Sequence, residues 1–482
     1  MRAASWDWVE PEDFFVTHVA DRERSFWLDG SGSRPWSGRM SYVGWLDDSA
    51  PSLTLHAAAA RVTEHGGSGS RLVGTDIFEV LADYAGRLPS GGSQAGWVGF
   101  FGYAARLDLP AQLDPNPDVV DACWMRANRF VAFDHQRRRV HAVSPPDHAE
   151  AWRSEVSALL ASTTRAVAPA AEIAVARIVS SCAPEQFAVA FDEVQAQLRL
   201  GNSYETNLTF RIVAKSAADP VDVYRRLRRL NPAPYAALIT HHGTSLLSSS
   251  PERFATVDAA GLIETRPIKG TTPRDADPAK DEAAAARLRD EPKFVGENLM
   301  IVDLLRNDLS RVCDVGTVQV TDLMHVESYS SVHQLITTIG GHLRPEVSTL
   351  SALHALFPGG SMTGAPKLRT MSIIAEVESS PRGAYAGALG WILDDGSADL
   401  GITIRSLVHR DGRYELGTGG GITVRSRCEE ELTETGWKVQ TLLSALGLPA
   451  GSLQRWPLHS SDRAALQLAA LTRTNPAAPP LS

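Results

Sequence analysis

The residues most able to carry chemistry lie in segment 264–274, which reads ETRPIKGTTPR. The segment holds one lysine, Lys269, two positions after Pro267 and directly before Gly270. Proline restricts the backbone, and glycine permits conformations closed to other residues, so this lysine sits in a constrained stretch. It is either a solvated turn residue or a positioned amine. Only a partly desolvated amine can lose its proton near neutral pH and act as a nucleophile.

A helix is expected over residues 293–311, because apolar side chains recur there at helical spacing. Glu297 and Asp308 fall on a stripe beside the apolar one, near the edge of the core. A carboxylate in that place either binds a ligand or remains a solvated acid. The apolar stripe consists of Val295, Leu299, Val302, Leu305 and Leu309.

A second helix is expected over residues 428–446, and it is rich in acids near its start. Glu431 and Glu434 are three residues apart, so both side chains could reach one cation. Mg²⁺ prefers one or two carboxylates together with water and substrate oxygens. The alternatives are a favourable interaction of the acids with the helix dipole and an ordinary ion pair between Glu434 and Lys438.

Two glycine-rich segments, 357–367 and 417–423, are expected to be turns with exposed backbone N–H groups. In the first, Gly359 and Gly364 have the spacing of a phosphate-binding loop. Two residues separate Gly364 from Lys367, however, so the motif is excluded. Exposed N–H groups suit a carboxylate as well as a phosphate. Tight turns between strands are the equally weighted alternative.

Composition limits the possible partners. The chain has 482 residues, a formal net charge of −9, 43% hydrophobic and 21% charged residues, as in globular proteins. The negative charge argues against nucleic-acid binding, and no apolar run is long enough for a membrane helix. The four cysteines are far apart and predict neither a zinc site nor disulfides. A cytoplasmic protein without a secretory signal is expected.

The chain divides into three parts. Residues 1–165 contain many short β-type runs, and most of their tryptophans are expected in the core. A Pro/Ala segment, 163–176, could be a linker. Residues 173–447 combine helices and strands, and their first helix is predicted to begin near Pro184. Residues 448–482 are expected to form a C-terminal tail.

Several motifs follow one another within 173–447. They are SPERF (250–254), TRPIKGTTPR (265–274), ENLMIVDLLRNDLSRV (297–312), GGSMTGAPK (359–367), GAYAG (383–387), ITIRS (402–406) and GTGGGIT (417–423). In this order they resemble the chorismate-binding enzymes, a family that includes anthranilate synthase large subunits, aminodeoxychorismate synthase component I and isochorismate synthases. Residues 1–165 resemble the N-terminal region of the same family more loosely. The resemblance implies an α+β protein with the anthranilate synthase component I-like fold, in which large β-sheets pack face to face with helices outside.

Within this family the lysine discriminates between activities. Anthranilate synthases usually read PIAGT, whereas PIKGT is similar to aminodeoxychorismate synthase component I. The resemblance therefore implies that the lysine attacks C2 of chorismate and that the C4 hydroxyl is lost. Ammonia then adds at C4 to give 4-amino-4-deoxychorismate. This product is a precursor of p-aminobenzoate and folate. Anthranilate synthase component I and a non-catalytic chorismate-binding subunit are the alternatives. No cysteine has the glycine neighbours of a glutaminase nucleophile, so ammonia is expected to come from a separate glutamine amidotransferase chain.

The resemblance also implies roles for individual residues. The expected catalytic residues are Lys269 as nucleophile, Glu252 as general acid/base and Thr271 as a hydrogen-bonding hydroxyl. The expected chorismate-binding residues are Tyr385, Arg405, Thr363, Gly419, Gly420 and Gly421. The expected Mg²⁺ ligands are Glu297, Glu431 and Glu434.

Two positions depart from the family pattern. Glu205 stands where anthranilate synthases tend to have glutamine and isochorismate-type enzymes a lysine base, which argues against water as the nucleophile. His333 falls one position before the usual family histidine, and Gln334 takes that place. A histidine in such an apolar run is more often a hydrogen-bonded core residue than a catalytic one.

Overall fold

The computed structural model describes most of the chain. The described residues are 5–30, 37–67, 69–86, 95–166, 176–180, 182–329, 332–449 and 451–452. Most of the Pro/Ala segment 163–176 and of the expected tail 448–482 lies outside them. Within the described residues, no helix is both long enough and apolar enough to span a membrane.

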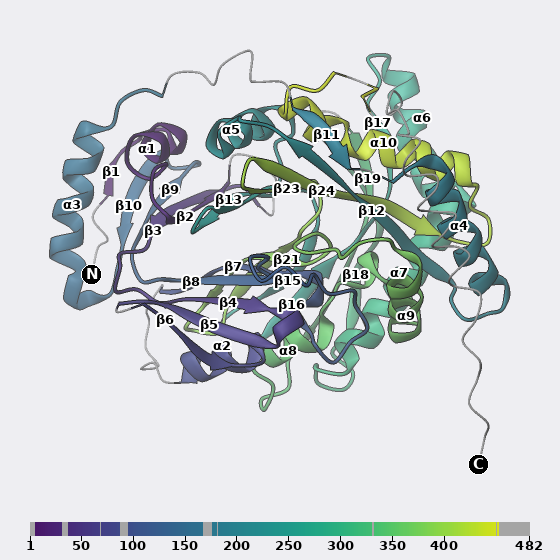
Figure 1. Cartoon of the computed structure of the whole chain (residues 1–482), viewed down its shortest axis with the longest axis horizontal. Helices are drawn as coiled ribbons and strands as arrows, with labels where there is room; N and C mark the ends of the chain where they lie inside the picture. The colour runs from purple at the N-terminus through teal and green to yellow at the C-terminus, as the bar shows by residue number, and fades with distance from the viewer. Residues whose placement is uncertain are drawn as a thin grey trace.

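Two large antiparallel sheets face one another across the middle of the molecule (Figure 1). The first sheet runs β1 (Ser5–Asp7), β10 (Arg139–Val143), β9 (Phe130–Asp134), β3 (Met40–Trp45), β2 (Arg24–Asp29), β13 (Tyr235–His241), β14 (Thr244–Ser250), β23 (Ser406–Arg410), β24 (Arg413–Ile422), β12 (Glu205–Lys215) and β11 (Arg177–Ser180), with β20 (Gly364–Ala365) beside β12. The second runs β17 (Ile268–Pro273), β19 (Val332–His342), β16 (Leu262–Arg266), β15 (Arg253–Val257), β22 (Ala398–Ile402), β21 (Ala388–Leu393), β7 (Gly96–Phe101), β8 (Ala122–Ala127), β4 (Ser52–His56), β5 (Arg61–Gly66) and β6 (Gly69–Gly74), with β18 (Gln319–Ser328) beside β19.

Both sheets combine strands from the two ends of the sequence. In the first sheet, β2 pairs with β13, where Trp27 lies opposite Leu238. In the second, β7 pairs with β21, where Gly99 lies opposite Gly390. The expected α+β architecture with sheets packed face to face is therefore confirmed. The predicted boundary between residues 1–165 and 173–447 stays a prediction. Strands of both parts share each sheet, so this boundary does not separate one sheet from the other.

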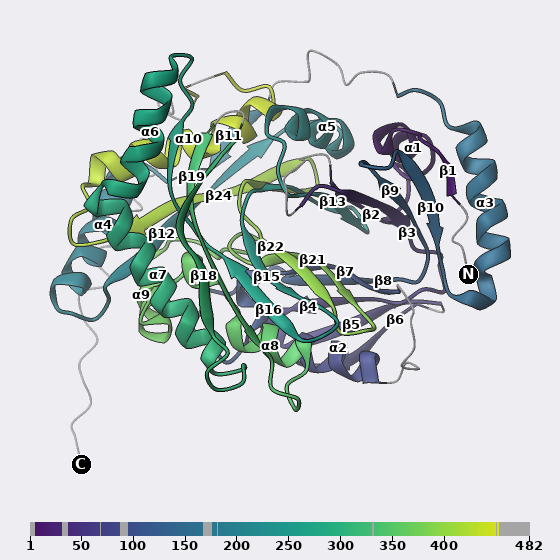
Figure 2. The same cartoon turned by 180° about the vertical axis from the view of Figure 1, so that it is seen from behind.

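Helices cover the outer faces of the sheets and the ends of the molecule (Figure 2). They are α1 (Pro11–His18), α2 (Ile77–Gly86), α3 (Ala149–Ser162), α4 (Pro184–Arg199), α5 (Pro220–Leu230), α6 (Pro278–Asp290), α7 (Pro292–Ser310), α8 (Thr349–Leu356), α9 (Lys367–Val377) and α10 (Cys428–Ala445). Helix α4 begins at Pro184 as predicted. It ends before Gly201, whose φ of +75° no β-branched residue would readily adopt.

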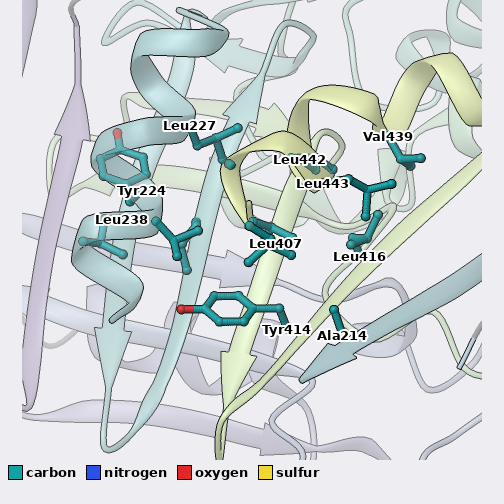
Figure 3. Packing of buried hydrophobic residues seen from close by; sticks show 14 of the residues in the cluster. Ala214, Tyr224, Leu227, Leu238, Leu407, Tyr414, Leu416, Val439, Leu442 and Leu443 are labelled. Carbon is teal, nitrogen blue, oxygen red and sulfur yellow. The ribbon is translucent and has the colours of Figure 1, made fainter. Parts of the chain in front are cut away.

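The hydrophobic core has a layer outside the first sheet and another between the sheets. On the outer face of the first sheet, leucine and valine side chains of α5 and α10 pack against β13, β23 and β24 (Figure 3). Between the sheets, Phe26 and Leu246 meet Phe100 and Leu389. Most described tryptophans of the N-terminal part are buried as expected, among them Trp27, Trp45, Trp97 and Trp124. Trp36 lies outside the described residues.

Two expectations about local structure were wrong. Most of segment 417–423 is not a turn, because β24 continues through Ile422 and pairs with β12. Glycine has little intrinsic preference for a strand, so the sequence could not reveal one there. Leu299 is 48% exposed, because the buried stripe of α7 runs through Asn298, Val302, Leu305 and Leu309 instead. Leu299 follows Asn298 directly, so its side chain points about 100° away from that stripe.

Candidate functional site

Lys269 projects from a β-bulge. Its strand β17 pairs with β19 at Ile268 and again at Thr271, but the register shifts between these positions. Gly270 has a φ of +90°, so the bulge requires a residue that tolerates the left-handed region. Bulges commonly re-aim a side chain near an active site. The side chain of Lys269 is accordingly only 12% exposed.

The amine of Lys269 contacts a buried acid from the opposite sheet. Lys269 Nζ donates to Glu205 Oε1 at 2.5 Å, and Glu205 is 1% exposed at the start of β12. Gly421 lies directly against this ion pair. A Cβ on Gly421 would come within 2.2 Å of Glu205 Oε1 and 3.3 Å of Lys269 Nζ. A glycine is therefore required at position 421 for the two charged groups to meet.

Three carboxylates control the protonation of Lys269. Burial lowers the pKa of its ammonium, but Glu205, Glu297 and Glu252 together raise that pKa above its usual value. Lys269 therefore carries its proton at neutral pH in this arrangement. A nucleophilic role requires that a neighbouring group remove this proton.

Glu252 lies in the short connection between β14 and β15 and is 5% exposed. The Ser361 hydroxyl donates to Glu252 Oε1 at 2.7 Å. Burial raises the pKa of Glu252 to about 7, although Ser361 and Lys269 oppose the shift. A carboxyl group that titrates near neutral pH suits general acid/base catalysis.

The three acids predicted to bind Mg²⁺ come from α7 and α10. Burial raises the pKa of Glu297 to about 7, with Glu205 and Glu431 adding to the effect. Burial also raises the pKa of Glu431, which is 3% exposed. Lys438 Nζ lies 2.7 Å from Glu434, so the ion pair considered as the alternative to metal binding is present.

The donor chemistry at this place fits a hard cation, because carboxylate oxygens are the ligands that Mg²⁺ prefers. Burial and the neighbouring Glu434 raise the pKa of Glu431. Lys293 Nζ lies 3.7 Å from Glu431 and opposes that shift. Within the described residues, no three acidic, histidine or cysteine side chains are grouped so as to hold a metal ion. The magnesium assignment therefore stays a prediction.

The inner face of the β12–β24 pair is polar and narrow. Side chains alternate along a strand, so Glu205, Thr209 and Arg211 share one face of β12 while Leu208, Phe210 and Ile212 face the core. On β24, Gly419 lies opposite Thr209, Gly417 lies opposite Arg211, and Gly421 lies opposite Asn207, two residues after Glu205. The absence of side chains at these glycines opens space above the polar face.

Tyr385 occupies part of that space. A Cβ on Gly417 would come within 2.2 Å of Tyr385 Cγ, so the ring packs directly against the glycine. The guanidinium of Arg211 lies 4.7 Å from the centre of the same ring. Tyr385 is thus held between β24 and an arginine, at a distance along β24 from Lys269.

Gly419 and Gly420 approach other groups closely. A Cβ on Gly419 would lie 2.2 Å from the carbonyl oxygen of Leu208, and one on Gly420 would lie 3.1 Å from Glu431 Oε2. Beyond Leu416, β24 keeps its pairing with β12, whereas its pairing with β23 ends there. The free edge of β24 therefore runs beside the acids of α10.

Arg405 lies in the connection between β22 and β23, with a φ of +50°. That conformation is uncommon for a residue with a side chain and recurs at functional sites. Burial lowers the pKa of its guanidinium, while Tyr385 and Glu434 oppose the shift. Among the described residues, no hydrogen bond or ion pair involves the Arg405 side chain. It is therefore available to bind a carboxylate in a bidentate manner.

The two threonines predicted for the site are placed differently. Thr363 is 0% exposed, and its hydroxyl donates to the carbonyl of Gly360 at 3.2 Å. Its backbone carbonyl accepts from the Asn207 N–H at 2.9 Å, so Thr363 joins the GGSMTGAPK segment to β12. Thr271 is exposed on β17 and has no hydrogen bond from its hydroxyl to any described residue. Neither hydroxyl contacts the Lys269–Glu205 pair.

His333 is a satisfied core histidine, as expected. It is 2% exposed, and its ring nitrogens contact Ser328 at 2.7 Å and Asp281 at 2.9 Å. Glu205, by contrast, was noted only as a departure from the family pattern. Its contact with Lys269 joins residues 64 positions apart on different sheets, and only the tertiary fold reveals it.

A family model described as chorismate binding enzyme matches residues 42–444. The chain belongs to the chorismate-binding enzyme family. The family match spans both sheets and covers each of the predicted site residues named above. Among solved structures, the chain is similar to anthranilate synthase component I of Streptococcus pneumoniae. The two align with a TM-score of 0.72 and 26% identity, over 85% of this chain and 93% of that one. The expected anthranilate synthase component I-like fold is therefore confirmed.

Relatives within the family are similar over most of the chain. An aminodeoxychorismate synthase of Streptomyces pristinaespiralis is 38% identical over 459 residues, which is 90% of this chain. The chain spans 63% of the length of that relative. Aminodeoxychorismate synthase component 1 of Klebsiella aerogenes is 38% identical over 356 residues, covering 73% of this chain and 77% of the relative.

Proposed function

We propose that the chain catalyses the conversion of chorismate and ammonia to 4-amino-4-deoxychorismate, as aminodeoxychorismate synthase component I. The observation that carries the proposal is the buried amine of Lys269, which extends from the bulge in β17 into a site ringed by acids. The names of the two relatives support the same activity. A lysine in this position can direct ammonia to C4 by occupying C2.

Chorismate is an anion with two carboxylates, and the site offers complementary groups. Arg405 can bind one carboxylate, and Tyr385 with the edge of β24 at Gly419–Gly421 can hold the other. In this pose the ring carbon C2 faces Lys269, and the C4 hydroxyl faces Glu252.

The reaction then proceeds in two displacement steps. The neutral amine of Lys269 bonds to C2, the ring double bonds shift, and the C4–O bond breaks while Glu252 donates a proton, so water leaves. Ammonia next bonds to C4, the double bonds shift back, and the C2–N bond breaks to release Lys269. Mg²⁺ held by Glu297, Glu431 and Glu434 would supply positive charge that stabilises the substrate carboxylate and the departing hydroxyl group.

Ammonia would come from a glutamine amidotransferase on a separate chain, and the product would serve p-aminobenzoate and folate synthesis. The four cysteines are all free thiols, which supports a reducing, cytoplasmic location. Anthranilate synthase component I is the second candidate, supported by the structural similarity to that enzyme of Streptococcus pneumoniae. A purely binding subunit has no such support and would not need the acids around Lys269.

The deciding experiment is to incubate the pure protein with chorismate, Mg²⁺ and ammonium at mildly alkaline pH and to identify the product by chromatography and mass. Formation of 4-amino-4-deoxychorismate is the expected result. Anthranilate would overturn the proposal in favour of the second candidate. Bound but unconverted chorismate would indicate a binding subunit.

The magnesium proposal needs its own test. Chelation should abolish product formation, and added Mg²⁺ should restore it. Glu434→Gln should raise the Mg²⁺ concentration needed for half-maximal activity, because it removes one predicted ligand. Full activity of the chelated protein would contradict the metal assignment.

A further inference from the structure

We propose that Glu205 is the group that accepts the proton of Lys269 before the amine attacks its substrate. This inference rests on the proposed function and assigns a role that the sequence motifs do not. Among the described residues, it concerns the one acid that accepts a hydrogen bond from the reacting nitrogen. Glu252 and Glu297 influence Lys269 only through space, whereas Glu205 Oε1 accepts a hydrogen bond from Nζ at 2.5 Å.

The surroundings of Glu205 suit a proton acceptor. Its carboxylate is almost fully buried, and Oε2 has no hydrogen-bond partner among the described residues. Lys269 is therefore the one described group that donates to this carboxylate and stabilises its charged form. Once the proton has moved along the hydrogen bond, the pair becomes a neutral amine beside a neutral acid. Burial disfavours the charged form of the Lys269 amine, which assists this transfer.

The other acids of the site have competing tasks. Glu252 must keep its proton until it can give it to the departing C4 hydroxyl. Glu297 is assigned to Mg²⁺, with two acids of α10. Glu205 remains as the acid whose contact with Lys269 has no other assigned purpose. Two carboxylates in one site thus take opposite roles, a base at Lys269 and an acid at the leaving group.

The proton count closes over the cycle. The Lys269 ammonium gives a proton to Glu205, and the amine bonds to C2 while Glu252 protonates the departing hydroxyl as water. After ammonia has bonded to C4, the C2–N bond breaks and Lys269 leaves as a neutral amine. Glu205 returns its proton to Lys269, and Glu252 regains one from solvent. Overall, chorismate and ammonium yield aminodeoxychorismate and water.

Gly421 provides independent geometric support. The ion pair occupies the volume that any side chain at this position would need. Gly421 lies opposite Asn207 on the neighbouring strand, and Glu205 is two residues before Asn207 on the same face. Three separate strands therefore contribute to this contact: β12 provides Glu205, β17 provides Lys269, and β24 provides the glycine that leaves room for both.

The test is the pH dependence of kcat/KM in Glu205→Gln, which keeps the shape but cannot accept the proton. At neutral pH the rate should fall by about 10²–10⁴-fold. Measured relative to the wild-type protein at the same pH, the variant's rate should then rise roughly tenfold per pH unit, because its amine must lose the proton to solvent while Glu252 titrates in both proteins. The wild-type protein transfers the proton internally and should lack this rise. Other charged groups near the pair are Glu252 before β15, Lys293 and Glu297 on α7, and Glu431, Glu434 and Lys438 on α10.

A matched control is Glu64→Gln on β5, where a partly buried acid pairs with Arg71 at 2.7 Å. It should leave both the rate and the pH profile unchanged. Should Glu205→Gln fail to fold, Gly421→Ala keeps both charged groups but displaces them. The variant is then mixed with chorismate in the absence of ammonia. It should form far less covalent adduct than the wild-type protein, and that adduct is detected as an increase in protein mass equal to chorismate less water.

The outcomes separate this inference from the proposed function. If the wild-type protein makes no aminodeoxychorismate, the proposed function fails. If it does, and Glu205→Gln has the wild-type rate and profile, the inference alone is overturned. A uniform loss of rate at every pH would also overturn it, since Glu205 would then only position Lys269.

Discussion

Two buried lysine–carboxylate pairs in this molecule have nearly the same geometry and opposite surroundings. Lys269 lies 2.5 Å from Glu205, and the side chains are 12% and 1% exposed. Lys367 lies 2.6 Å from Asp308, and the side chains are 14% and 5% exposed. Both lysines come from family motifs. Distance and burial alone therefore do not reveal which lysine can react.

The neighbours distinguish the two pairs. Burial lowers the pKa of Lys367, and Arg106 and Arg311 add to that effect. Lys367 also donates to the carbonyl of Leu356 at 2.8 Å, at the end of α8. That lysine thus ties α7, α8 and α9 together, whereas Lys269 faces acids. What distinguishes Lys269 is the set of neighbouring carboxylates, one of which could remove its proton.

The largest expected effect is that of Lys269→Ala. Product formation should fall by about 10³-fold or more, because the group that bonds to C2 is gone. Steady-state kinetics and the loss of the covalent adduct measure the change. Chorismate binding should persist through Arg405, and a normal rate would contradict the covalent mechanism.

The corresponding change in the other pair, Lys367→Ala, should act on stability. It leaves Asp308 buried without its partner, so the free energy of unfolding should fall by about 3–5 kcal/mol. Urea denaturation measures this loss. The exposed Lys280→Ala on α6 is the control and should change little. Equal stability of both variants would remove the structural role of Lys367.

Glu252 should make stability depend on pH. Its pKa rises from about 4.5 in the unfolded chain to about 7 in the folded protein. The folded state therefore holds its proton more tightly, and stability falls as pH rises from 4.5 to 7. Above that window the cost is roughly 3 kcal/mol. Glu252→Gln should flatten the dependence in part, with Glu297 supplying the rest, when unfolding is measured at about pH 5 and pH 8. An unchanged slope would contradict the raised pKa of Glu252.

The smallest effect is expected from Gly436→Ala on α10, the helix that carries Glu431 and Glu434. No atom lies within 4 Å of the added Cβ, so the change should only favour the helix. The free energy of unfolding should rise by about 0.5–1 kcal/mol, with product formation unchanged. Thermal melting measures the gain. A loss of activity would mean that the acids near Lys269 depend on the flexibility of α10.

Sequence patterns predicted those features that depend on local chemistry. Pro184 predicted the start of α4, and apolar residues at helical spacing predicted α7. The spacing of Glu434 and Lys438 on α10 offered an ion pair as one interpretation, and that pair is present. The motifs also named the lysine, the acids and the arginine that the fold brings together. Segments with a strong period are the ones for which local rules suffice.

Features that depend on contacts between distant segments were missed. The glycines of β24 were expected in a turn, because the groups that require them, the Tyr385 ring and the Lys269–Glu205 pair, lie far away in the sequence. The contact of Glu205 with Lys269 crosses from one sheet to the other and follows no local pattern. Such contacts are determined by topology, which a single sequence does not display.

The sharing of both sheets by the two ends of the chain has a consequence for synthesis. When residues 1–165 leave the ribosome, β2 and β7 have no β13 or β21 to pair with. Both strands then expose hydrogen-bonding edges and apolar faces that invite aggregation until the rest of the chain arrives. Pairings so distant in sequence also form slowly. The nascent chain therefore keeps one unpaired edge on each sheet until the ribosome completes the second half.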